Sequence, residues 1–128
     1  MHYLVGTDSV HTTAAICDYL EERATGDDTV TVVALAPTDD ATARRDAQEA
    51  LNVAPVRLVA VGDVRTELRD EDGSSADRLL EMADDVDADE LLVTARSPVG
   101  PSTSSDSSRQ SLLEEASLPV VVVPDPVR

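Results

Sequence analysis

Segments that favour a strand alternate with segments that favour a helix along the whole chain of 128 residues. Runs rich in valine, threonine and leucine predict five strands, over residues 2–6, 29–35, 64–69, 90–93 and 120–123. Helical spacing of apolar residues predicts helices over residues 10–24, 39–51, 74–86 and 109–116. Such alternation is typical of a parallel sheet with helices on both faces. We therefore expect a single three-layer α/β/α domain over residues 1–128.

One segment fits two structures. Residues 53–61, VAPVRLVAV, have the valine content of a strand. They also fit a helical stretch that begins near Pro55, because proline is favoured in the first turn of a helix. The sequence leaves both structures open for this segment.

The charge of the chain restricts its partners and its surroundings. Its net charge is −16, from 26 acidic residues against 10 basic ones, and all the basic residues are arginine. A surface of this sign disfavours nucleic acids and anionic membranes, which bind basic surfaces. Abundant aspartate without lysine is typical of proteins from extreme halophiles. In molar salt the Debye length is about 3 Å, so like charges on the surface barely repel each other. The alternative is an acidic protein of an ordinary organism.

Apolar runs and the cysteine content bear on where the protein is located and on the state of its thiol. The apolar run Val120–Val123 is too short to span a bilayer, and the N-terminus lacks the pattern of a signal peptide. We therefore expect a cytoplasmic protein. Cys17 is the only cysteine, so it forms no internal disulfide and no thiolate metal site. Its apolar neighbours predict a buried thiol.

Motifs for catalysis are missing from the sequence. It contains no glycine-rich dinucleotide loop, no P-loop and no nucleophile elbow. His2 and His11 are far apart, no Cys/His cluster exists, and the acidic run 84–90 lacks the spacing of a calcium loop. We expect neither a metal site nor an enzyme.

Two features predict a ligand site. Asp8 follows the first strand, and ligands of parallel sheets bind beyond the carboxyl ends of the strands. The alternative for Asp8 is a cap on the first helix. Residues 94–108 form a loop rich in serine that leads into a helix, which is the arrangement of an anion site. The alternative is a loop without a ligand.

Three blocks of sequence resemble the universal stress protein family. Thr7-Asp8-Ser9 resembles its Val-Asp-Gly-Ser, Ala88–Val93 its Ala-Asp-x-Ile-Val-Val, and Ser117–Pro124 its Cys-Pro-Val-Leu-Val-Val. The resemblance covers nearly the whole chain, and the acidic composition indicates the haloarchaeal type. It implies an adenine nucleotide alpha hydrolase-like fold with a five-stranded parallel sheet in the order 3-2-1-4-5. It also implies a homodimer that pairs through the strand Val120–Val123.

The resemblance also implies where a nucleotide would bind. Many members hold ATP in a loop of the pattern Gly-x-x-Gly-x₉-Gly-[Ser/Thr]. Here Thr94 and Ser97 stand at the first two glycines, and Ser107-Ser108 at the third glycine and its hydroxyl partner. Arg96 matches an arginine common in that turn. The candidate residues for a weakly bound ATP or AMP are therefore Asp8, Thr94, Arg96, Ser97, Ser107 and Ser108.

Two functions follow from these observations. The first is a dimeric stress-response regulator with a degenerate nucleotide loop and no catalytic activity. The alternative is an ATP-binding switch of the same fold with slow ATPase activity. A phosphorelay receiver is disfavoured because its mechanism needs a lysine, and a flavin carrier because only Tyr3 and Tyr19 offer rings for stacking.

Overall fold

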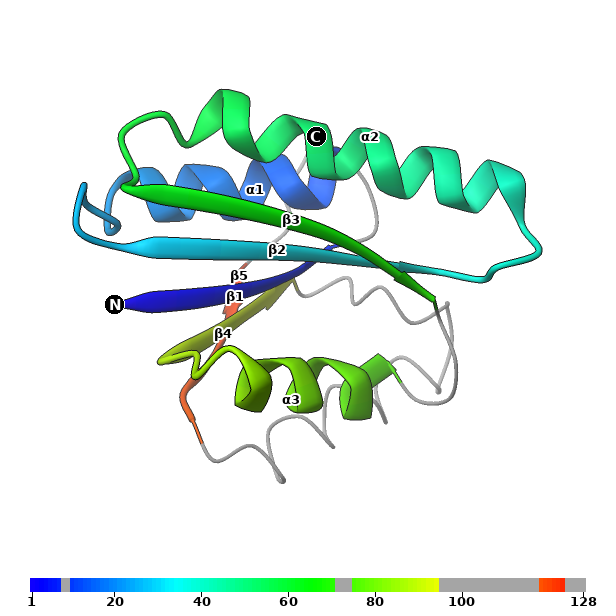
Figure 1. Ribbon diagram of the computed structural model, residues 1–128. Helices are drawn as coiled ribbons and strands as arrows, with labels where there is room; N and C mark the ends of the chain where they lie inside the picture. The colour runs from blue at the N-terminus through cyan, green and yellow to red at the C-terminus, as the bar shows by residue number, and fades with distance from the viewer. Residues whose placement is uncertain (8–9, 71–74, 95–117, 124–128) are drawn as a thin grey trace.

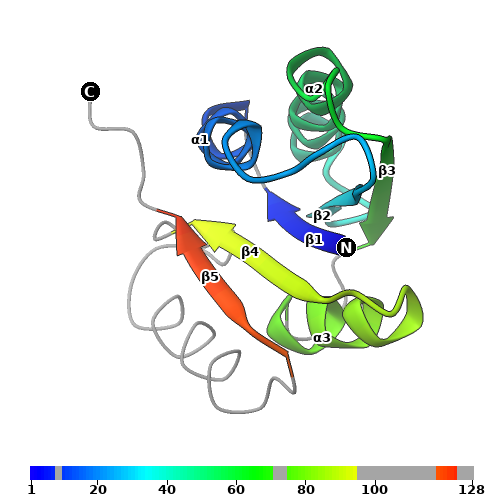
Figure 2. The same ribbon diagram turned by 90° about the vertical axis from the view of Figure 1, so that its left-hand side faces the viewer.

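The computed structural model describes residues 1–7, 10–70, 75–94 and 118–123 (Figure 1). In chain order, the elements of this part are β1 (His2–Thr7), α1 (Val10–Glu21), β2 (Thr29–Ala36), α2 (Ala41–Arg57), β3 (Asp63–Asp70), α3 (Ser75–Asp85), β4 (Glu90–Thr94) and β5 (Val120–Val123). The five strands form one parallel sheet in the order β3-β2-β1-β4-β5. Helices α1 and α2 cover one face and α3 the other (Figures 1 and 2). The predicted α/β fold and strand order are confirmed, while the predicted helix 109–116 lies outside the described residues.

The ambiguous segment 53–61 divides between a helix and a turn. Helix α2 begins after Asp40, whose carboxylate accepts a hydrogen bond from the Ala43 amide at 2.9 Å. It continues through Pro55 to Arg57, so the end predicted at residue 51 was wrong. Ala54 and Leu58 are buried, and the Leu58 amide donates to the Ala54 carbonyl at 2.9 Å. This contact with the core explains why the helix continues.

The core lies on both faces of the sheet. On the face of α1 and α2, a cluster of small and branched side chains includes Val5, Val32, Ile16 and Leu51. Cys17 belongs to it at 2% exposure, which confirms the predicted buried thiol, and burial raises the pKa of this thiol to about 11. The second cluster gathers Leu4, Val33, Leu91 and Val93 of the sheet with Leu79, Met82 and Ala83 of α3.

The two edges of the sheet differ in chemistry. At one edge, β3 exposes Asp63, Arg65 and Arg69, and charged side chains of this kind discourage pairing with another chain. At the other edge, β5 consists of valines, and Val122 is 38% exposed. None of the helices in the described part of the chain has the length and apolar character needed to cross a bilayer.

Candidate functional site

The site that this topology favours lies at the carboxyl edge of the sheet, between β1 and β4. The chain leaves β1 through α1 toward β2 on one face, and it reaches β4 from β3 through α3 on the other face (Figure 2). Connections that diverge in this way leave a crevice outside the strand ends, where α/β proteins bind their ligands. Thr7 ends β1 and Thr94 ends the neighbouring β4, so both residues lie where this topology predicts the crevice.

Threonine hydroxyls surround the end of β1. The Oγ1 atoms of Thr7 and Thr13 are 2.7 Å apart, and both residues are almost fully buried. Thr12, in the first turn of α1, is buried as well. The Thr7–Thr13 contact ties the end of β1 to the start of α1. It therefore holds both ends of the short connection that contains residues 8 and 9.

The helix ends at this edge favour an anion over a cation. The N-termini of α1 and α2 carry a partial positive charge from the helix dipole. In α2, the carboxylate of Asp40 already accepts a hydrogen bond from a backbone amide of the first turn. The first turn of α1 holds no acidic residue. Arg44 of α2 lies between the ends of β2 and β3, and it pairs with Asp70 at 3.0 Å. Among the described residues, no three His, Cys, Asp or Glu side chains are arranged so that they could hold a metal ion together.

Most of the residues predicted for the site lie outside the described part of the chain. This is so for Asp8, Arg96, Ser97, Ser107 and Ser108. Thr94 is described as the last residue of β4, where it pairs with Val123 of β5. The prediction missed Thr7, Thr12 and Thr13, although a polar strand end followed by two threonines in a helical first turn was a signal for them.

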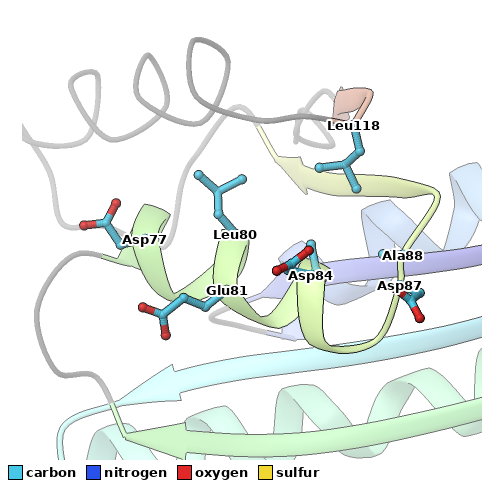
Figure 3. Close-up of a pocket in the computed structure, with 8 residues that line it drawn as sticks. Asp77, Leu80, Glu81, Asp84, Asp87, Ala88 and Leu118 are labelled. Carbon is cyan, nitrogen blue, oxygen red and sulfur yellow. The ribbon is translucent and has the colours of Figure 1, made fainter.

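A hollow on the flank of α3 is unsuited to phosphate. It has a volume of about 640 Å³ between α3 and Leu118 (Figure 3). Its lining residues are Asp77, Leu80, Glu81, Ala83, Asp84, Asp87, Ala88 and Leu118. Among these described lining residues, four carry carboxylates and none is basic, so their field repels anions. A nucleotide therefore fits the carboxyl edge better than this hollow.

Comparison with known proteins identifies the fold. No protein-family model and no curated protein matches the sequence. Solved structures match it over nearly its full length. A universal stress protein from Archaeoglobus fulgidus in complex with dAMP is 20% identical with a TM-score of 0.69, and the match covers 96% of this chain and 97% of that one. This chain has the universal stress protein fold.

Two further universal stress proteins agree with this assignment. One, in complex with cAMP, is 22% identical with a TM-score of 0.66, and the match covers 98% of both chains. A family member from Arabidopsis thaliana with AMP bound is 12% identical with a TM-score of 0.66, and coverage is 99% of this chain and 93% of that one. At these identities the likeness establishes the universal stress protein fold, and the sheet order agrees with it.

Proposed function

We propose that this chain is a cytoplasmic stress-response regulator of the universal stress type, which binds an adenine nucleotide weakly at the carboxyl edge and catalyses no reaction. One observation carries the proposal: three proteins that share this fold over nearly the full chain hold dAMP, cAMP or AMP. All three ligands contain adenine, a ribose-type sugar and one phosphate. We place the nucleotide beyond the ends of β1 and β4, beside Thr7 and Thr94, because α/β proteins bind their ligands outside the carboxyl ends of the strands.

Weak binding follows from the residues that replace the glycines of the family's loop. A loop around a triphosphate needs backbone amides that point inward and residues with positive φ. β-Branched Thr94 reaches such conformations only under strain, and Pro98 has no amide to donate. Asp106 adds a negative charge in the same loop. These residues favour a monophosphate over a triphosphate.

The alternative is an ATP-binding switch of the same fold that hydrolyses ATP slowly. It is favoured by the hydroxyls of Thr94, Ser97, Ser107 and Ser108, which keep the spacing of the family's loop. The two proposals differ in the affinity for the triphosphate and in the release of phosphate.

Calorimetry with AMP, cAMP and ATP at fixed salt tests the proposal, with UMP as the control ligand. We expect dissociation constants of about 100 μM or weaker for the adenine nucleotides, near −5.5 kcal/mol, and weaker binding of UMP. The triple change Thr94→Gly, Ser97→Gly and Asp106→Gly should tighten ATP binding. If the wild-type protein binds ATP at low micromolar concentrations and releases phosphate, the proposed regulator is wrong and the ATP-binding switch is the better proposal. If no adenine nucleotide binds at millimolar concentration, both proposals fail.

We further propose a homodimer that forms through β5. This strand is the edge of the sheet, so one side of its backbone has no strand partner among the described residues. Val122 is 38% exposed, and Val120 and Val121 are half-buried. A second copy of β5 would cover these valines and pair the free backbone groups.

A further inference from the structure

An uncharged patch lies at the end of the molecule opposite the carboxyl edge. It is formed by the last turns of α2 and the start of the turn to β3, and its exposed members are Asn52, Pro55, Val56, Val59 and Ala60. Val56 is 73% exposed and Val59 is 80% exposed. We call these five residues the α2-end patch. Figure 1 shows this end of α2 on the same side as the N-terminus, away from the arrowheads of the strands.

Folding does not explain the valines of the α2-end patch. Helix α2 packs through Ala47, Ala50, Leu51 and Ala54, which are buried, whereas Val56 and Val59 face water. Valine is a poorer helix former than alanine, glutamate or arginine. Exposed positions of α2 one and two turns before Asn52, where the patch begins, are polar or charged: Arg45, Gln48 and Glu49. Val56 and Val59 are three positions apart, and exposed apolar side chains that gather without a packing role mark an interaction site.

Carboxylates form the rim of the patch. Arg57, beside Val56, pairs with both Asp18 and Glu21 of α1, so one guanidinium faces two carboxylates. The turn between α1 and β2 also lies beside the patch, because a Cβ on Gly26 would lie 3.9 Å from the Ala60 carbonyl oxygen. Asp27 in that turn is exposed. The centre of this surface is therefore apolar, and its rim toward α1 and the following turn carries more carboxylates than cations, within a chain of net charge −16.

We propose that the α2-end patch docks a protein partner whose apolar side chains are flanked by arginine or lysine. Interfaces combine an apolar centre with a polar rim, and complementary charge across the rim selects the partner. A second copy of this chain fits poorly, because it would bring two acidic rims together. The patch is separate from both the nucleotide edge and β5, so this inference does not depend on the proposed function.

The test maps the binding of a defined probe by NMR on ¹⁵N-labelled protein. The probe is a synthetic amphipathic peptide with leucines on one face and arginines on the other. A control peptide replaces every leucine with serine and keeps the charge. We expect the largest shift changes at residues 52–60 and in the neighbouring turn 24–28, with weaker binding of the control peptide.

Matched variants make the test specific. Val56→Ser with Val59→Ser should weaken binding of the leucine peptide about tenfold. Val10→Ser should leave it unchanged, because Val10 is also exposed, at 41%, but lies outside the patch. If the double serine variant does not fold, Val56→Thr with Val59→Thr keeps the side-chain shape and replaces it. Fold is checked by circular dichroism.

Three outcomes would overturn the inference. The first is a set of shifts spread over the acidic surface without a centre at the patch. The second is equal binding of the two peptides, which would show attraction by charge alone. The third is self-association that the Val56→Ser and Val59→Ser changes abolish, which would make a second copy the occupant.

Discussion

At Gly62 two turns approach so closely that a side chain has no space. A Cβ there would lie 2.2 Å from the Gly26 carbonyl oxygen and 3.0 Å from that of Asp28, and both obstacles are backbone. We expect Gly62→Ala to destabilise the fold by about 1–3 kcal/mol, because the turns must separate. Gly26→Ala is the matched control, since its nearest neighbour is 3.9 Å away. Urea unfolding at fixed salt measures both, and equal midpoints would contradict the steric argument.

His2 makes stability depend on pH near neutrality. Its Nε2 lies 2.7 Å from Oγ1 of buried Thr31. Burial, and then the positive charge of Arg65, lower the pKa of His2 below 6.5, although Asp89 opposes the shift. The unfolded chain therefore takes up this proton at higher pH than the folded one. The contribution is fully present above pH 6.5 and declines as the pH falls below it.

We expect wild-type protein to lose more thermal stability between pH 7.5 and 5.5 than His2→Gln, whose amide can hydrogen-bond to Thr31 but does not titrate. Melting curves at constant ionic strength provide the measurement. Parallel curves for the two proteins would show that His2 is not the group responsible.

Among the elements, β5 is the strand through which we propose that two copies of the chain pair. Val123 is 5% exposed and belongs to the core, so a charge there would damage the fold as well as an interface. Val122 is exposed, and we expect Val122→Asp to give monomers in light scattering, because the charge would be buried between two copies. Val10→Asp adds the same charge at an exposed valine outside β5 and should leave the dimer intact. A Val122→Asp protein that remains dimeric would refute this interface.

For the whole molecule, the dominant quantity is the net charge of −16. The described ion pairs involve mostly half-exposed side chains, and pairs of this type contribute little individually. Repulsion therefore grows when salt is removed, since the Debye length rises from about 3 Å at 1 M to about 10 Å at 0.1 M. We expect the melting temperature to fall as KCl is lowered over this range. Sucrose in place of KCl is the control for solute exclusion, and a melting temperature that does not fall on desalting would contradict the halophilic interpretation.

Local sequence determined the strands and most of the helices of this protein. Val120–Val123 was predicted with its observed bounds, and β1 and β2 to within a residue, because β-branched runs bounded by turn residues have few other stable structures. Residues 53–61 fit both a strand and a helix in sequence, and the burial of Ala54 and Leu58 against the core decided for a helix as far as Arg57. The strand order was implied by resemblance, since pairing between strands distant in sequence leaves no local pattern.

For the candidate site, too, part could be predicted from the sequence and part was decided only by the tertiary structure. Its position beyond the strand ends follows from the alternation of elements, which the sequence displays. That Thr94 and Ser97 stand where the loop of universal stress proteins has glycines is a prediction that rests on the resemblance in sequence. The contact between Thr7 and Thr13 and the exposed α2-end patch were decided only by the tertiary structure. Which threonines meet and which valines face water depends on how the elements pack against one another, and that packing is a property of the whole fold.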